Sequence, residues 1–395
     1  MSKLDYQSRN VLVSVVVPTK NEELTIEKFI TWVQIGFKSC GVPGELILLD
    51  NSDDSTPVIA SKLGAIVHRP SSLGLGAAYK EAVDLIRGKY VILGDADCTY
   101  DFRDISGFIN ALKESDFVMG NRFGGGGIER GSMPIHHRYF GSPLTSWILR
   151  SVHQLNISDV HCGMRAMTSD LYRNLPFSEP GWEYAPEMVI RACQAANSYQ
   201  QIPIRFLKAP KGRVSHFKRG PKSWLKPFQA GIGAIRVTLT LGLNRVTETV
   251  GKWLFFISTA LVVLISTGPI QFFEITFSTV TQVLFAMLGL TGNLMNSVGI
   301  HLKEFYAVEK GALRLQDFIQ LLDRRFQRLF VFITTFLSLA FLIMSLIVVG
   351  VSQNKNDFGH YMYEFQGVFI LLIYILSLLF HRFLINIMSK YLAQT

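Results

Sequence analysis

The chain has 395 residues, is 49% hydrophobic and carries a formal net charge of +9, and its four cysteines form no CxxC pair, which excludes a zinc knuckle or a disulfide framework. The basic charge is concentrated between Met188 and Thr247, where there are many Lys and Arg residues and no Asp or Glu. Because this segment directly precedes long apolar stretches, it favours anionic lipid headgroups as its partner and argues against nucleic acid.

The first half alternates short apolar runs with helical patterns. Strands are predicted at residues 11–17, 45–49, 89–94 and 116–120, and helices at residues 22–37 and 76–88. This alternation predicts an α/β fold with a mostly parallel sheet and flanking helices. In such a sheet ligands bind at the carboxyl ends of the strands, where the polar clusters PTKNEE, DNSDDST and DADCTYD stand.

The second half is dominated by long apolar stretches. Four membrane spans are predicted, near residues 253–270, 276–300, 329–351 and 365–389, each close to the ~20 residues that cross a bilayer core. The connection from His301 to Arg328 is rich in Lys and Arg, whereas the other two connections hold at most one such residue. This asymmetry predicts a multi-pass membrane protein whose N-terminal domain faces the cytoplasm.

The predicted organisation therefore has three parts. Residues 1–215 form a cytoplasmic domain, residues 216–250 a basic amphipathic segment beside the membrane, and residues 251–395 the membrane domain. The middle segment mixes Lys and Arg with Trp224, Leu225 and Phe228, which is typical of helices that lie on a bilayer. An ordinary linker is the alternative for this segment.

Asp95 and Asp97 follow the apolar run at residues 89–94. In an extended backbone residues i and i+2 point to the same side, so both carboxylates can face one ligand while Ala96 packs behind them. Two carboxylates this close repel each other unless a cation compensates, and Mg²⁺ or Mn²⁺ prefers such oxygen ligands together with substrate phosphates. The pair indicates a metal that holds a nucleotide diphosphate, with a solvated loop as the alternative.

Seven motifs occur in a characteristic order: VVVPTKNEE, LLDNSDDST, SLGLGAAYKEA, ILGDADCTYDF, VMGNRF, DVHCGMRAM and EYAPEMVIRA. Over about residues 11–220 the chain resembles family 2 glycosyltransferases of the GT-A fold, in particular dolichol-phosphate or polyprenyl-phosphate glucose and mannose synthases. The resemblance implies inverting transfer of a hexose from a nucleotide-diphosphate sugar, such as UDP-glucose or GDP-mannose, to a dolichyl or undecaprenyl phosphate. Transfer to a lipid hydroxyl and a non-catalytic scaffold or flippase are the alternatives.

The resemblance also implies roles for individual residues. The donor side would use Pro18, Asn21 and Glu22 at the base and ribose, Asp50 at the base, Gly76 in a loop near phosphate, and Asp95 and Asp97 at ribose, metal and diphosphate. The acceptor phosphate would lie near Arg122 and Arg138. Two departures leave questions open: whether Asp53 or Asp54 takes the second acidic role, and what Thr99 does where many relatives have Gln.

Four further residues are candidates for the site. Asp159 is either a general base or a carboxylate that binds sugar hydroxyls and orders Arg165, and sugar binding is preferred for a phosphate acceptor. Glu187 is favoured over Glu183 as a site residue. Lys211 and Arg213 precede the membrane segment and are expected near the lipid phosphate. A homo-oligomer is left open.

Overall fold

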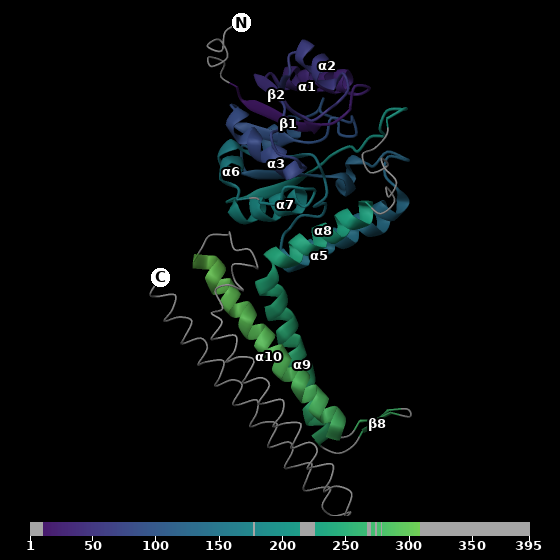
Figure 1. The fold of residues 1–395 in the computed structure, drawn as a ribbon, viewed down its shortest axis with the longest axis vertical. Helices are drawn as coiled ribbons and strands as arrows, with labels where there is room; N and C mark the ends of the chain where they lie inside the picture. The colour runs from purple at the N-terminus through teal and green to yellow at the C-terminus, as the bar shows by residue number, and fades with distance from the viewer. Residues whose placement is uncertain are drawn as a thin grey trace, which may run out of the picture. The chain divides into compact units, whose positions relative to one another are not determined.

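The computed structural model describes residues 11–176, 178–213, 226–266, 270–272, 275–277 and 279–308. The chain divides into two compact units, Met1–Leu241 and Gly242–Thr395 (Figure 1). The predicted three-part division stays a prediction, but its middle segment is shared between the units. Residues 214–225 lie outside the described residues, α8 (Lys226–Leu241) belongs to the first unit, and α9 (Leu243–Ser266) belongs to the second.

The first unit is built on a seven-stranded sheet with the order β3-β2-β1-β4-β6-β5-β7. Its strands are β1 (Val13–Thr19), β2 (Gly44–Asp50), β3 (Ile66–His68), β4 (Tyr90–Leu93), β5 (Phe117–Asn121), β6 (Arg165–Thr168) and β7 (Tyr199–Pro203). Pairing is parallel except at β6, which runs antiparallel to both β4 and β5. The sheet is therefore mixed, because one strand outside the predicted set is inserted in the reverse direction.

Helices that fall into two groups by their mutual contacts pack around this sheet. The helices before α8 are α1 (Ile26–Cys40), α2 (Thr56–Lys62), α3 (Leu75–Glu81), α4 (Ser106–Ala111), α5 (Ser142–His153), α6 (Ser169–Asn174) and α7 (Tyr184–Ala195). Short turns of other helix types are η1 (Ala82–Leu85), η2 (Arg122–Gly126) and η3 (His137–Gly141). Helix α1 contacts α2 and α4, whereas α7 contacts α3, α6 and α8.

The core explains why the strands lack alternation. Val15, Val16 and Val17 on β1 are all fully buried, as expected for a strand that is covered on both faces. Helix α1 buries Phe29, whose ring meets that of Phe102 edge to face at a centroid distance of 5.1 Å. This packing holds the carboxyl ends of β1, β2 and β4 at one edge of the sheet, where the polar clusters follow.

The second unit contains α9, β8 (Ile270–Phe272), β9 (Ile275–Phe277) and α10 (Thr279–Val308). Helices α9 and α10 approach closely at glycines, because a Cβ on Gly251 would lie 2.3 Å from the backbone nitrogen of Asn296. Within the described residues one helical stretch, Leu243–Ile265, is long and apolar enough to cross a membrane. The predicted spans at 253–270 and 276–300 overlap α9 and α10, whereas those at 329–351 and 365–389 lie outside the described residues.

Candidate active site

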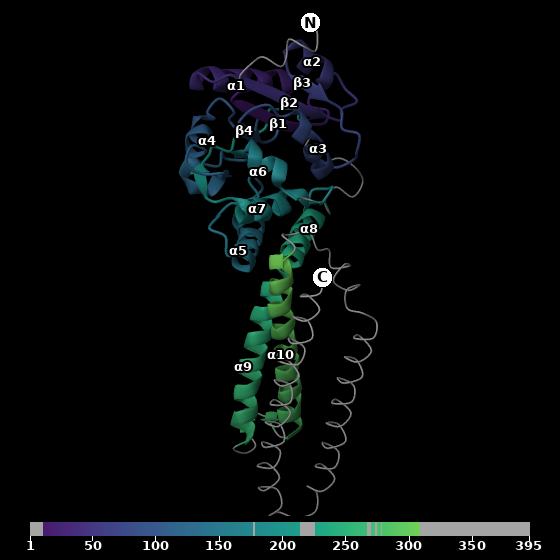
Figure 2. The ribbon, with the colours of Figure 1, turned by 90° about the vertical axis from the view of Figure 1, so that its left-hand side faces the viewer.

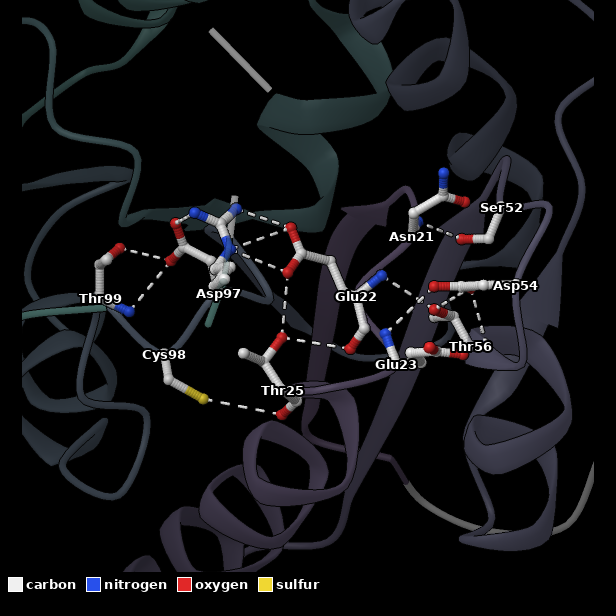
Figure 3. Close-up of polar contacts among 11 residues, drawn as sticks. Asn21, Glu22, Glu23, Thr25, Ser52, Asp54, Thr56, Asp97, Cys98 and Thr99 are labelled. Carbon is white, nitrogen blue, oxygen red and sulfur yellow. Dashed lines mark hydrogen bonds and ion pairs between the residues drawn. The ribbon is translucent and has the colours of Figure 1, made fainter. Parts of the chain in front are cut away.

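Hydrogen bonds join the polar loop after β1 to the polar loop after β2. The backbone N–H of Asn21 donates to Ser52 Oγ at 2.7 Å, as Figure 3 shows. Asn21 Oδ1 accepts from the backbone N–H of Asp53 at 2.9 Å. Asn21 has a positive φ of 54°, which asparagine tolerates better than most residues. These contacts hold the two loops together at the sheet edge where β1 and β2 end in register.

Two of the three acids in the DNSDDST cluster, which begins at the end of β2, accept hydrogen bonds that order this loop. Asp50 is buried and accepts hydrogen bonds from Thr19 Oγ1 and Ser52 Oγ, both at 2.7 Å. Asp54 accepts from the backbone N–H of Glu23 and from Thr56. Asp53 is exposed, so its carboxylate is the one of the three that is open to a ligand.

Glu22 and Asp97 face the same point from different loops, as Figure 3 shows, and Arg213 joins them. Arg213 Nε lies 2.9 Å from Glu22 Oε2, and its Nη2 lies 2.6 Å from Glu22 Oε1. Its Nη1 lies 3.1 Å from Asp97 Oδ2. All three side chains are largely buried, and the guanidinium that the sequence placed near a lipid phosphate lies between Glu22 and Asp97.

The Asp97 carboxylate is oriented from its other side by Thr99. Asp97 Oδ1 accepts from the backbone N–H of Thr99 at 3.0 Å and also from the Thr99 hydroxyl. The threonine therefore closes a local turn around the carboxylate and orders it through its hydroxyl and its backbone N–H.

Asp95 lies close to Asp97 and to several guanidinium groups. Desolvation raises the pKa of Asp95, the Asp97 charge raises it further, and Arg165, Arg213 and Arg122 oppose the rise. The Asp95 side chain retains access to solvent even though protein atoms crowd its carboxylate. A Cβ on Gly163 would lie 2.6 Å from Asp95 Oδ2, so this glycine leaves room for the carboxylate, a role that the HCGMR motif did not reveal.

The two carboxylates fit a hard divalent cation. Within the described residues there is no group of three or more His, Cys, Asp and Glu side chains that could hold a metal ion. Asp95 and Asp97 would thus supply only part of a coordination sphere, as Mg²⁺ sites do when phosphate oxygens complete them. A cation would also relieve the repulsion between the Asp95 and Asp97 carboxylates, which are two residues apart.

Arg122 and Asp159 form a buried ion pair. Arg122 Nε and Nη2 lie 2.7 and 2.8 Å from the two Asp159 oxygens, and the Arg122 backbone N–H donates to Oδ2 at 3.1 Å. Asp159 is fully buried, and its partner is Arg122, whereas the sequence suggested Arg165. Both carboxylate oxygens are engaged, which leaves the group poorly placed to take a proton from a substrate.

Arg165 enters the site from β6 and is almost completely buried. Its Nη1 donates to the carbonyl oxygen of Ala185 at 3.1 Å, while its buried Nε has no hydrogen-bond partner. A buried donor without a partner is costly, so its presence next to Asp95 is consistent with a ligand oxygen. Arg138 is half-buried on η3, with its guanidinium 5.5 Å from the Tyr139 ring centroid.

Glu187 and Gly76 both form contacts with the loop at residues 178–180. Glu187 is buried and accepts hydrogen bonds from the backbone N–H groups of Ser178 and Glu179, and it pairs with Arg191. Gly76 donates to the carbonyl oxygen of Pro180 at 2.9 Å, and a Cβ there would lie 2.0 Å from the carbonyl oxygen of Glu179. Among the other predicted residues, Pro18 lies in β1 opposite Leu49, and Lys211 is exposed.

His161 lies on the loop that carries Asp159. Its Nε2 is 2.6 Å from Thr145 Oγ1 on α5, and burial lowers the pKa of the imidazole to about 4. The neighbouring Cys162 thiol is buried and directed to the carbonyl oxygen of Met164. Both side chains therefore pack the loop.

The fold and the site define an α/β protein with an acidic pair at the carboxyl edge of its sheet. Residues 14–175 match the family model described as Glycosyl transferase family 2. The low-salt glycan biosynthesis hexosyltransferase Agl6 of Haloferax volcanii is 36% identical over 54% of this chain and 51% of its own length. The dolichyl-phosphate hexose transferase of the same organism is 26% identical over 55% of this chain and 89% of its own.

The chain spans about half the length of Agl6, and 64% of a second relative, the glycosyltransferase AglJ of the same organism. Among solved structures, mannosyl-3-phosphoglycerate synthase from Rubrobacter xylanophilus aligns with a TM-score of 0.45 and 19% identity. The alignment covers 58% of this chain and 74% of that one.

Proposed function

We propose that this chain transfers a hexose from a nucleotide-diphosphate sugar, UDP-glucose or GDP-mannose, to a polyprenyl phosphate at the cytoplasmic face of a membrane. The observation that carries the proposal is the pair Asp95 and Asp97 among guanidinium groups that act on it electrostatically. Carboxylates that hold a cation, together with arginines, suit the diphosphate of a nucleotide sugar. The similarity to a dolichyl-phosphate hexose transferase supports the lipid phosphate as acceptor.

On the donor side, Asp95 and Asp97 would hold Mg²⁺ or Mn²⁺, which when bound supplies positive charge to the departing diphosphate. The hydrogen-bonded loops that carry Asn21 and Asp53 would receive the base and ribose. Asp50 would order the residues that line this pocket, since its carboxylate is buried and accepts hydrogen bonds from Thr19 and Ser52. Pro18 and Glu22 would line the same pocket, and Gly76 would lie in a loop near the phosphates.

On the acceptor side, a phosphate oxygen would attack the anomeric carbon from the face opposite the leaving diphosphate and invert its configuration. The new carbon–oxygen bond forms as the bond to the nucleotide diphosphate breaks, and the nucleotide leaves as the diphosphate. A phosphate monoester has a second pKa near ~6 and is largely dianionic at neutral pH, so no strong base is needed. The complete engagement of Asp159 by Arg122 supports this route over transfer to a lipid hydroxyl.

Arg122, Arg138 and Arg165 are proposed to bind the acceptor phosphate and the sugar. Arg122 is held in place by Asp159, and Arg165 brings a buried donor that lacks a partner. Glu187 is proposed to act indirectly, by ordering residues 178–179 beside the site. Lys211 remains a candidate for the lipid phosphate, since it is exposed next to Arg213.

The membrane part of the proposal rests on composition and on Leu243–Ile265, the one candidate span among the residues that the structure describes. The four-span topology, with the domain of residues 1–215 in the cytoplasm, remains part of the proposal. It would keep the soluble donor and the phosphate of a membrane-bound acceptor on the same side of the bilayer.

The test is sugar transfer by the purified full chain in detergent, with labelled UDP-glucose or GDP-mannose. Each donor is offered polyprenyl phosphate or the corresponding polyprenol, with and without EDTA. We expect a mild-acid-labile product only from the phosphate acceptor, lost with EDTA and in Asp97→Asn but kept in the exposed control Asp84→Asn. A product from polyprenol alone would contradict the phosphate mechanism, and donor binding without any transfer would favour a scaffold.

A further inference from the structure

Helix α5 has the opposite burial pattern to an ordinary surface helix. It buries small or polar residues, Ser142, Ser146 and His153, together with Leu149. Two of its large apolar residues point outward: Leu144 is 56% exposed and Trp147 is 61% exposed. A surface helix normally buries its apolar stripe, so this arrangement indicates that the outer face meets an apolar partner.

The exposed apolar residues continue into η3, which leads directly into α5. Phe140 is 73% exposed and precedes Leu144 and Trp147 with the i, i+4, i+7 spacing of one helix face. Tyr139 and Ile135 are exposed beside it. The apolar face is defined here as Ile135, Tyr139, Phe140, Leu144 and Trp147.

The charged residues in the segment that carries this face all have one sign. From Arg130 to Ser158 the sequence contains no Asp or Glu, and it contains Arg130, Arg138 and Arg150. Arg150 is exposed on α5 itself. Exposed aromatic and aliphatic side chains with basic neighbours are the composition of surfaces that lie in the headgroup region of anionic bilayers.

The fold places this face near a chain segment that itself leads toward a membrane. Helix α5 packs against α8, and His153 Nε2 lies 3.0 Å from the carbonyl oxygen of Thr238. Helix α8 ends at Leu241, and the candidate span begins at Leu243. Within the first unit, α5 and α8 lie at the end remote from α2, as Figure 2 and Figure 1 both show.

We propose that the apolar face of η3 and α5 inserts into the headgroup region of an anionic bilayer and seats the catalytic domain on the membrane. This contact is additional to the membrane domain and to the basic segment at residues 216–250, because it assigns a surface of the sheet domain itself. Under the proposed function, it would also bring Arg138, which lies on η3 within this surface, to the level of a lipid phosphate.

The test measures the depth of single spin labels in the full chain, reconstituted in phosphatidylglycerol nanodiscs. The labels are attached to Leu144→Cys and, as a matched control, to Val58→Cys on α2, which is 55% exposed. Both variants carry Cys40→Ser, because Cys40 is the half-exposed native cysteine and the other three are buried. Relaxation by oxygen, which partitions into lipid, is compared with relaxation by a water-soluble nickel complex.

We expect the ratio of oxygen to nickel accessibility to be about fivefold higher at position 144 than at position 58. The ratio at position 144 should fall in phosphatidylcholine nanodiscs and in Arg150→Glu, but not in Arg69→Glu, which changes an exposed arginine outside this surface. Equal ratios at positions 144 and 58 would overturn the proposal. Spin–spin broadening between labels at position 144 would also overturn it, because a second copy would then cover the face. None of these readouts requires sugar transfer, so the outcome is independent of the proposed reaction.

Discussion

Arg213 Nη1 lies 3.1 Å from Asp97 Oδ2, at the position where a divalent cation would be expected to meet that carboxylate. The same guanidinium forms a two-pronged ion pair with Glu22. In this arrangement an arginine partly neutralises the acidic pair, and a metal ion that binds there has to compete with it. The relationship gives the first of four predictions.

Replacing Arg213 should strengthen metal binding when no donor is present. Arg213→Ala frees Asp97 Oδ2, so we expect Mn²⁺ to bind about tenfold more tightly, which corresponds to about 1.4 kcal/mol. The measurement is a titration of free Mn²⁺ by electron paramagnetic resonance. Lys211→Ala, an exposed neighbour, should leave the affinity unchanged. Weaker Mn²⁺ binding by Arg213→Ala would show that the arginine supports the metal site instead of competing for it.

Removing the charge of Asp159 should destabilise the first unit. Asp159→Asn leaves the buried guanidinium of Arg122 without its counter-charge, and we expect a loss of about 3 kcal/mol in the free energy of unfolding. Asp101→Asn breaks a pair whose Arg103 is 42% exposed, and it should cost less than about 1 kcal/mol. The free energy of unfolding of each variant is measured by urea unfolding. Equal stability of the two would contradict a structural role for the Asp159 ion pair.

Gly76 is predicted to be required for packing. In Gly76→Ala the new Cβ would lie 2.0 Å from the carbonyl oxygen of Glu179, so we expect a stability loss of about 1–3 kcal/mol. Gly231→Ala is the matched control, since a Cβ there meets nothing within 4 Å, and it should stabilise α8 by roughly 0.5–1 kcal/mol. Thermal unfolding tests both changes. A Gly76→Ala protein of normal stability with weakened donor binding would instead support the phosphate-loop role.

His161 should make the first unit less stable in mild acid. Its pKa is about 4 in the folded chain, so between that value and the usual 6.5 the unfolded state binds more protons. Stability from this group is therefore full above pH 6.5 and is lost as the pH falls, by up to about 2 kcal/mol between pH 7 and pH 5. His161→Gln should lose less over that interval in urea unfolding at the two pH values. An identical pH dependence in both proteins would rule the histidine out as its cause.

The apolar runs predicted much of the sheet. Short apolar runs marked β1, β2, β4 and β5, because a strand buried on both faces is apolar along most of its length. Three strands were missed: β3 has only three residues, β7 is half-exposed and polar, and β6 begins with Arg165. In such short strands the pairing with neighbours, and not the local sequence, decides the conformation.

For the candidate site, the sequence predicted polar clusters at the carboxyl ends of the strands, where the structure has them, but it did not determine the partners of their side chains. It associated Asp159 with Arg165 and Arg213 with the lipid phosphate, whereas the structure pairs these residues with Arg122 and with Glu22 and Asp97. Gly163 was not singled out, although it makes room for Asp95. Such contacts join residues far apart in the chain, and no local pattern encodes them.

The sequence by itself determined the α/β alternation, the polar clusters that end the strands, the ordered motifs and the apolar stretches of the second half. These properties are local, because strand burial, turn chemistry and membrane insertion depend on neighbouring residues. Only the tertiary structure decided that β6 runs antiparallel, that Arg213 occupies the space between Glu22 and Asp97, and that α5 turns Leu144 and Trp147 outward. Each of these depends on which distant segments pack together, and packing selects among conformations that the local sequence permits equally well.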